Sequence, residues 1–381
     1  MIKENSAFKI ITHPHFNLLF RKSDGYTATW GATKEEDPDF SPLGPIIADI
    51  EISEICHEGC KFCYKANMAK GANMSFETFK AIFHKLPRTL TQIAFGLGSI
   101  PTTHYYKEVE VEDANKQMKT IEINGKKYVE ITKDEYMQNK SNPKYIERDE
   151  DGPEDFRKIV EYCRNNDYQY VVPNVTINGS RMTPEWYDFF AKNMGAIAVS
   201  HYDDDRCFDA VKELTDRGMK QVNIHRMVSE ETFDECMALI EKVKIDPRLT
   251  KLNAVVFLML KQRGRGKDFN RLTDEHYKIF IDRLFESGIS FGFDSCGAAR
   301  LLKHGVDKEV EKFVTPCEST RESCYINVHG KFYPCSFNEN GDGIDVASCD
   351  DFLTDVWNYK DTAEWRQKLI DNGCNCPSYL V

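Results

Sequence analysis

The chain has 381 residues, of which 41% are hydrophobic, so it can form one large α/β domain with a smaller appendage. Its net charge of −11 excludes a global electrostatic field for nucleic acid, and no nucleic-acid partner is expected. The sequence has no long apolar run and no signal-peptide core, which predicts a cytoplasmic protein with no membrane partner. In that compartment, thirteen cysteines favour metal ligation over disulfides.

The first predicted elements place a loop at the end of a buried strand. Residues 1–44 are expected to form a small β lead-in. The apolar, β-rich segment 45–53 predicts a buried parallel strand. Helical periodicity follows over 74–86, where Ser75 is the expected N-cap. The residues between this strand and this helix therefore form a loop, which is where α/β barrels carry their chemistry.

That loop carries three cysteines, Cys56, Cys60 and Cys63, at C-x3-C-x2-C spacing, with an aromatic residue, Phe62, before the last. Three thiolates can hold three irons of a [4Fe–4S] cluster and leave the fourth iron open to a chelating molecule. A structural zinc site is less consistent with the pattern, because zinc takes four ligands and His57 is too close to Cys56 to be the obvious fourth. Buried core thiols are a further alternative, but glycine and charged residues separate these cysteines.

The arrangement resembles the signature of the radical S-adenosylmethionine (radical SAM) superfamily. The resemblance implies that S-adenosylmethionine chelates the open iron of a cluster held by Cys56, Cys60 and Cys63. An electron from the cluster then breaks the sulfonium bond and releases a 5′-deoxyadenosyl radical, while the protein positions the cofactor. The resemblance also implies a partial (β/α)6 TIM-like barrel, with Phe62 among the cofactor contacts.

The following segments alternate between predicted strands and predicted helices, which indicates an α/β fold with a parallel sheet. Strands are expected over 91–98, 170–177, 196–200, 221–226 and 252–260. Helices are expected between them, over 153–165, 184–193, 207–217 and 230–245. Together with the first strand, these elements match the six strands of the partial barrel, so the radical SAM domain is expected over 45–285.

One segment, 104–152, interrupts this alternation and is expected to be an insertion after the second barrel strand. Within it, Asn124-Gly125 lies between alternating strands over 119–131, which is the strongest short signal of a β-hairpin. We therefore expect an inserted hairpin with a polar linker. It is either a tolerated surface decoration or a lid or partner-docking arm, because it leaves from the active-site end of a strand.

Gly96-Leu-Gly98-Ser99 ends the second barrel strand, where radical SAM proteins carry a Gly-Gly-Glu-like segment that binds the methionine amine. By this resemblance, Gly96, Gly98 and Ser99 are cofactor contacts, and glycine allows the backbone to approach a ligand closely. The chain departs from the family pattern because it lacks the acidic residue, so the backbone role is the part that carries over. A plain turn between strand and loop is the alternative.

Later strand ends supply three more candidate cofactor contacts. Ser200 resembles the position that binds the ribose, and a hydroxyl group suits a diol. His225 shares one face of the fifth barrel strand with Asn223, either as a cavity-lining contact or as a paired core group. Leu260 matches the backbone position beside adenine. The basic loop 261–267 that follows is either solvated or an anion contact.

The last third of the chain, 286–381, contains seven of the thirteen cysteines. From Cys317 through a predicted hairpin to Cys335 the spacing is C-x12-G-x4-C, which resembles the SPASM/Twitch extension and its auxiliary [4Fe–4S] cluster. The cysteine run for a second cluster in the full SPASM form is absent. The resemblance implies one auxiliary cluster with Cys317, Cys335, Cys376 and Cys296 as ligands, and core thiols without a cluster are the alternative. Reserve ligands are Cys324, Cys349 and Cys374.

Asp294 is the candidate catalytic residue. It ends the predicted strand 289–294, two residues before Cys296, and is expected to point into the space between the two clusters. A carboxylate there can accept a proton from a substrate or bind a substrate amine. The alternative is an N-cap for a helix at 298–303, because Asp is a favoured cap residue.

Together these features predict a radical SAM enzyme that abstracts a hydrogen atom from its substrate. The SPASM/Twitch-like extension favours a ribosomally made peptide as that substrate, although residues 1–44 are short for a leader-binding domain. The alternatives are dehydrogenation or epimerisation of a small molecule and, in a different class, a non-catalytic iron–sulfur or zinc interaction protein. A reducing partner such as flavodoxin or ferredoxin is expected.

Overall fold

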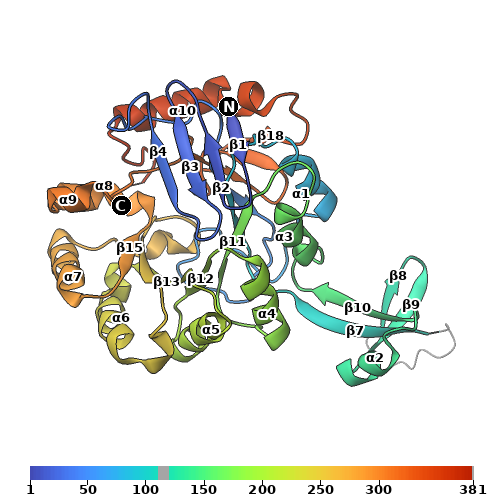
Figure 1. Cartoon of the computed structure of the whole chain (residues 1–381). Coiled ribbons are helices and arrows are strands. Elements are labelled where there is room, and N and C mark those ends of the chain that lie inside the picture. Colours follow the sequence, from blue (N-terminus) through green and yellow to red (C-terminus); the bar gives the residue numbers. More distant parts are fainter. Residues whose placement is uncertain (110–119, 380–381) are drawn as a thin grey trace.

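The computed structural model describes residues 1–109 and 120–379, and these centre on one ten-stranded mixed sheet (Figure 1). Its parallel part runs in reverse chain order through β15 (Phe291–Phe293), β14 (Ala254–Met259), β13 (Val222–Val228), β12 (Ile197–Ser200), β11 (Val172–Ile177), β6 (Gln92–Gly96) and β5 (Ile47–Glu51). Beyond β5 it continues with β16 (Ser323–Ile326), β17 (Lys331–Tyr333) and β18 (Ile344–Asp345). The predicted parallel sheet is therefore present, with its strands adjacent in chain order.

Helices alternate with these strands, as the sequence predicts: α1 (Phe76–Phe83), α3 (Phe156–Arg164), α4 (Pro184–Asn193), α5 (Asp204–Asp216), α6 (Phe233–Ile245) and α7 (Asp274–Ser287). Short 3-10 turns are η1 (Glu230–Thr232), η2 (Pro247–Leu249) and η3 (Gly264–Asp268). The helix expected over 207–217 starts earlier, because Asp203 caps it by accepting from the Arg206 backbone N–H at 2.9 Å. None of the helices in the described residues is long and apolar enough to cross a membrane.

Alternate residues of the central strands are buried under the helices, whereas the others face a hollow. In β13, Val222, Ile224 and Val228 are buried, and Asn223 and His225 between them are partly exposed. Successive side chains of a strand point to opposite faces of the sheet, so the two polar residues share the face that is not covered by helices. The buried face belongs to one continuous apolar core that includes residues from all the alternating helices.

The predicted β lead-in is an antiparallel meander of β1 (Ile2–Glu4), β2 (Phe8–Ile11), β3 (Asn17–Arg21) and β4 (Thr27–Trp30). Its apolar side packs against Ile46 and Val172, at the amino ends of β5 and β11. Lys9 is fully buried there, and its ammonium group donates to the carbonyl oxygens of Leu90 at 2.7 Å and Tyr170 at 3.2 Å. The meander therefore covers the end of the sheet opposite to the cysteine loop.

The insertion forms a separate antiparallel sheet, the arm, which projects from the body (Figure 1). In sheet order it contains β10 (Tyr145–Glu150), β7 (Thr102–Val109), β9 (Lys126–Ile131) and β8 (Thr120–Ile123), with helix α2 (Lys133–Asn139) between β9 and β10. The predicted hairpin is present, with positive φ at Asn124 (51°) and Gly125 (76°), and Lys119 lies outside the described residues. The predicted polar linker is wrong, because β7 and β10 pair with each other over six residue pairs.

The C-terminal third combines short helical segments with a hairpin that joins the main sheet. The helical segments are η4 (Ser295–Gly297), α8 (Ala298–His304), α9 (Lys308–Glu311), the π-helical turn Leu353–Trp357 and α10 (Lys360–Asp371). The predicted strand–turn–strand is the β16–β17 hairpin, with Gly330 at a φ of 76° in its turn. In the parallel pair of β16 and β5, Tyr325 lies opposite Asp49 and Ile326 opposite Ile50. The hairpin thus lies directly beside the strand that leads into the cysteine loop.

Replacing Lys9 by Met is expected to destabilise the protein by about 1–3 kcal/mol, because buried carbonyl groups lose their donor while the side-chain volume is nearly kept. Urea unfolding followed by circular dichroism measures this change. Lys3→Met, at an exposed position of β1, is the matched control and is expected to change stability very little. Equal stabilities of the Lys9→Met variant and the wild type would show that Lys9 does not hold the meander in place.

Candidate active site

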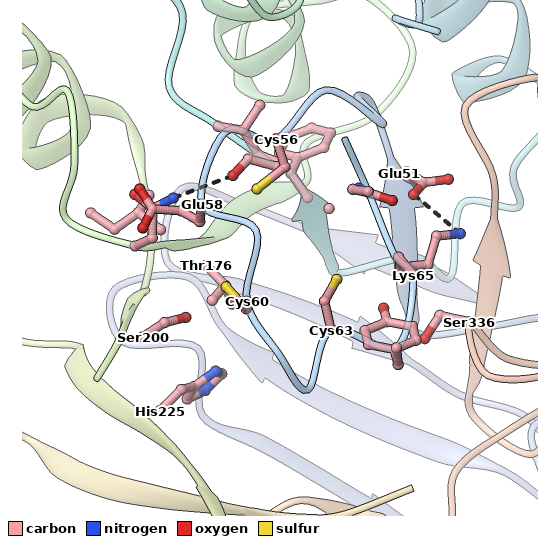
Figure 2. A pocket seen from close by; sticks show the side chains of 18 of the residues that line it. Glu51, Cys56, Glu58, Cys60, Cys63, Lys65, Thr176, Ser200, His225 and Ser336 are labelled. Atoms are coloured by element: carbon pink, nitrogen blue, oxygen red, sulfur yellow. Dashed lines mark hydrogen bonds and ion pairs between the residues drawn. The ribbon is translucent and has the colours of Figure 1, made fainter. Parts of the chain in front are cut away.

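A cavity of about 380 Å³ lies at the carboxyl ends of the parallel strands, and the three-cysteine loop forms part of its wall (Figure 2). Glu51, Gly96, Ile177 and Ser200, the last residues of four strands, line it. Eight of the predicted site residues border this cavity: Cys56, Cys60, Cys63, Phe62, Gly96, Gly98, Ser200 and His225. The fold therefore brings the metal-ligand candidates and most of the cofactor-contact candidates to one place.

The backbone of the cysteine loop packs tightly against the segment that follows β6. A Cβ atom on Gly98 would lie 2.2 Å from the carbonyl oxygen of Ile55 and 2.9 Å from the Cβ of Cys56, so only glycine fits. The hydroxyl of Ser99 accepts from the backbone N–H of His57 at 3.1 Å. Gly98 and Ser99 thus hold the cysteine loop. Ser99 itself is buried beside the cavity rather than in its lining, and its contact to the cofactor stays a prediction.

The basic loop after β14 covers another side of the cysteine loop. The guanidinium of Arg265 donates to the carbonyl oxygen of Cys60 at 2.8 Å and to that of Asn67 at 3.1 Å. The backbone N–H of Arg265 donates to the carbonyl oxygen of Cys63 at 3.0 Å. These bonds satisfy carbonyl groups that an irregular loop cannot pair by itself. Neither of the two roles expected for this basic loop, a solvated loop or an anion contact, describes Arg265, which holds the cysteine loop in shape.

Cys60 has a polar partner on the next wall of the cavity. Its thiol shares a hydrogen bond with the phenol group of Tyr202. Burial raises the pKa of Cys60, and the hydrogen bond from Tyr202 partly offsets this effect. The ring of Tyr202 also stacks on Phe62, with the two ring centroids 5.8 Å apart. Because a hydroxyl that donates to sulfur stabilises the thiolate, this contact suits a thiol that binds metal.

A buried ionic network, which the sequence analysis missed, joins the cysteine loop to two other parts of the chain. The ammonium group of Lys65 lies 3.1 Å from the carboxylate of Glu51 and 2.5 Å from that of Glu339. Tyr325 accepts from Lys65 at 2.8 Å and donates to Glu51 at 3.0 Å. Burial raises the pKa of Glu51, and the charge of Lys65 opposes this rise. The sequence signal that could have revealed this network is a pair of acidic residues, Asp49 and Glu51, at alternate positions of an apolar strand.

Asp49 is the second acidic residue of β5 that faces the cavity. Its side chain is open to the cavity but enclosed by protein, and this enclosure raises its pKa to about 6. Glu58 also lines the cavity, and its carboxylate pairs with Arg206 at 2.8 Å. Three carboxylates therefore line the cavity, those of Asp49, Glu51 and Glu58.

Ser200 and His225 lie opposite each other on the neighbouring strands β12 and β13, and both face the cavity. Burial lowers the pKa of His225 to about 4, so the ring is neutral near pH 7 and can both donate and accept a hydrogen bond. Leu260 is buried and donates its backbone N–H to Val228 at 3.2 Å outside the cavity lining. Leu258, two residues earlier, is the residue of this strand that lines the cavity. The contact of Leu260 to the cofactor stays a prediction.

The fold gathers four cysteines of the C-terminal third, and they are the predicted auxiliary ligands: Cys296, Cys317, Cys335 and Cys376. Burial raises the pKa of Cys296 and Cys317 to about 11 and that of Cys335 to about 12. The charges of the neighbouring thiolates contribute to these rises, with Cys376 acting on all three. Four thiols from four separate segments therefore lie within electrostatic reach of one another, and we call them the four-cysteine group.

The remaining cysteines are placed differently. Of the reserve ligands, Cys324 is buried in the apolar core and the thiol of Cys349 donates to the carbonyl oxygen of Val346 at 3.1 Å. Cys374 lies close enough to Cys317 to raise the pKa of Cys317. The helical cysteines are buried: Cys163, Cys207 and Cys236. Every cysteine lies in the described part of the chain, and all thirteen are free thiols.

Asp294 is engaged by two partners beside the four-cysteine group. Its carboxylate accepts from the backbone N–H of Met259 at 3.1 Å and forms an ion pair with the buried Lys261. Lys261 also shares a hydrogen bond with the thiol of Cys296. Asp294 occupies the N-cap position of η4, which leads directly into α8, but its side chain makes no capping hydrogen bond among the described residues. The catalytic role of Asp294 stays a prediction.

Both donor sets consist of thiols, which are the ligands that iron–sulfur clusters take. Among the described residues, no group of three or more His, Cys, Asp or Glu side chains is placed to hold a single metal ion. A [4Fe–4S] cluster spreads its ligands over separate irons. The three thiols of the cysteine loop are held from behind by Gly98 and Arg265 and border the cavity in front, which fits a cluster with one open iron. The four-cysteine group has enough thiols for a fully ligated cluster.

Solved structures with this fold include proteins bound to S-adenosylmethionine and to peptides. Streptococcus suis SuiB bound to precursor peptide SuiA has a TM-score of 0.62 at 11% identity, over 96% of this chain and 90% of SuiB. SuiB bound to S-adenosylmethionine has a TM-score of 0.61 at 10% identity, over 95% of this chain and 89% of SuiB. Native anSMEcpe with bound AdoMet and Cp18Cys peptide has a TM-score of 0.54 at 15% identity, over 84% of this chain and 82% of anSMEcpe.

Sequence comparison adds no closer relative. No protein-family model matches the chain, and no curated protein sequence matches it. The chain shares its fold with SuiB and anSMEcpe, both of which were solved with S-adenosylmethionine, and the predicted resemblance is confirmed at the level of the fold.

Replacing Gly98 by Ala is expected to displace the cysteine loop, because the added methyl group overlaps the carbonyl oxygen of Ile55. After anaerobic reconstitution, the variant should contain about four irons fewer per chain than the wild type, the content of one [4Fe–4S] cluster. Gly292→Ala is the matched control, because a Cβ atom there meets no other atom within 4 Å. Wild-type iron content in the Gly98→Ala variant would rule out this close packing as a requirement for the metal site.

Proposed function

We propose that this chain is a radical SAM enzyme that modifies a peptide. The observation that carries the proposal is the cavity, in which three thiols of one loop meet polar residues from adjacent parallel strands. Its support is a fold shared with enzymes solved with S-adenosylmethionine and with peptides. When bound, a [4Fe–4S] cluster and S-adenosylmethionine supply the 5′-deoxyadenosyl radical that abstracts a hydrogen atom from the substrate.

In this proposal, Cys56, Cys60 and Cys63 hold the cluster, and the cavity wall orients the cofactor. The neutral ring of His225 and the hydroxyl of Ser200 lie opposite each other, so both can hydrogen-bond a ribose. Residues assigned to the remaining cofactor contacts are Phe62, Gly96, Gly98, Ser99 and Leu260. The chain itself fixes these groups before any ligand arrives, because strand ends and a tightly packed loop carry them.

A peptide is the proposed substrate class. SuiB was solved with a precursor peptide and anSMEcpe with a peptide. The match to SuiB covers 96% of this chain, so it extends well beyond the barrel segment 45–285. The match to the peptide-bound SuiB structure therefore also extends into the meander and the C-terminal third.

The finer organisation is also a proposal. The open sheet with β5, β6, β11, β12, β13 and β14 is the partial (β/α)6 barrel of a domain over 45–285, which carries the arm as an insertion over 104–152. Residues 1–44 form the lead-in, and residues 286–381 form the auxiliary-cluster extension, in which the four-cysteine group holds a second [4Fe–4S] cluster. The cytoplasm as location and flavodoxin or ferredoxin as reducing partner complete the proposal.

Replacing Cys56, Cys60 and Cys63 together by Ala should abolish reductive cleavage of S-adenosylmethionine, because the thiolates of the radical cluster are lost. The variant should keep about four irons per chain, since the four-cysteine group is intact. Chromatographic measurement of 5′-deoxyadenosine and an iron assay check both expectations. Cys236→Ala, which removes a buried thiol of α6, is the control and should keep the wild-type 5′-deoxyadenosine formation and the wild-type iron content. Deoxyadenosine formation at the wild-type level in the triple variant would refute the assignment.

Asp294→Asn tests whether this carboxylate takes a proton from the substrate. If it does, product formation should fall by about 10²–10⁴-fold, the usual contribution of a general base, while cleavage of S-adenosylmethionine continues. Lys261→Met separates catalysis from positioning, because it removes the partner of Asp294 and leaves the carboxylate in place. Unchanged product formation in Asp294→Asn would end the catalytic assignment. An equal loss of product formation in both variants would show that Asp294 acts by holding Lys261 in position and not as a base.

A further inference from the structure

A second hollow, which we call the basic cleft, lies in the C-terminal third and has a volume of about 580 Å³. Its walls come from the residues before α7, from α7 and α8, and from the segment after α10. Among the described residues, the basic cleft and the substrate cavity have no lining residue in common. The two hollows are therefore separate sites.

The basic cleft is positively charged in a protein that is acidic overall. Arg271, Arg300 and Lys303 line it together with a single carboxylate, Asp274, which gives the described lining a net charge of +2. Arg300 is fixed in place, because it pairs with Asp274 at 2.9 Å and lies 4.1 Å from the ring centroid of Tyr277. Lys303 is exposed. The whole chain carries a net charge of −11, so this cleft differs in sign from the rest of the molecule.

Two members of the four-cysteine group, Cys296 and Cys376, also line the basic cleft. None of the four borders the substrate cavity within the described residues. A cluster held by these cysteines would therefore have its access to solvent through the basic cleft. Lys261, which pairs with Asp294, contacts Cys296 and is not in the described lining of the cleft.

We propose that the basic cleft is the docking site of an acidic one-electron carrier protein of the flavodoxin or ferredoxin kind, which exchanges electrons with the auxiliary cluster. The proposal rests on the proposed function, because it requires that cluster. In the reducing direction, the carrier loses one electron and the oxidised cluster gains it, and no bond forms or breaks. Repulsion over the acidic remainder of the surface and attraction at the cleft steer such a carrier to this place. The cysteines in the wall favour a redox partner over other polyanions.

The test uses flavodoxin as the probe and compares Lys303→Glu with Lys192→Glu. Lys192 is an exposed lysine of α4, so the control makes the same change in charge away from the cleft. Binding of flavodoxin to the reconstituted holoprotein is measured by calorimetry at low and high salt. The rate of electron transfer from reduced flavodoxin is measured by stopped flow in the Cys56/Cys60/Cys63→Ala protein, whose remaining iron belongs to the auxiliary site.

At low salt, Lys303→Glu should weaken binding and slow electron transfer by about tenfold or more, because charges at the rim of a docking site act mainly on association. High salt should remove most of the difference, and Lys192→Glu should behave as the wild type. Equal effects of the two variants, or no effect of Lys303→Glu, would overturn the docking proposal while leaving the proposed function intact. An iron-free triple variant would overturn the auxiliary cluster and the docking proposal together.

Discussion

The parallel pairing of β16 with β5 is the contact on which the placement of the two cysteine groups depends. β5 leads into the loop with Cys56, Cys60 and Cys63, and the β16–β17 hairpin leads to Cys335. A one-residue slip would turn the side chains of β16 to the opposite face of the sheet. Tyr325 would then leave the network around Lys65. The hydrogen bonds of one strand pair therefore set the position of both groups at once.

The cysteine loop is irregular, and its order comes from groups far away in the sequence. Ser99 accepts from the loop backbone, Gly98 packs under it, and Arg265 supplies donors to its carbonyl groups. These contacts use the backbone of the loop, and the three cysteines border the cavity. A metal cluster can then bind without a large ordering cost, because the loop backbone is already fixed.

The sequence predicted the parts of this structure that depend on local patterns. Alternating strands and helices, the Ser75 cap of α1 and the hairpin at Asn124-Gly125 follow from periodicity and turn chemistry. The Glu51–Lys65–Tyr325 network could not be predicted in the same way, because Tyr325 lies 274 positions from Glu51 in the chain. The other two strands of the arm, β7 and β10, were missed because their many polar residues gave no regular apolar alternation.

Asp294 shows the same limit at a single residue. Its position after a strand was visible in the sequence, but its partner Lys261 reaches it from the end of a neighbouring strand. A buried ammonium group is costly without a counter-charge, which the carboxylate of Asp294 provides for Lys261. The pair lies beside the four-cysteine group, because Lys261 also contacts Cys296. The acidic groups Asp49 and Glu51 face the cavity at the carboxyl ends of the strands instead.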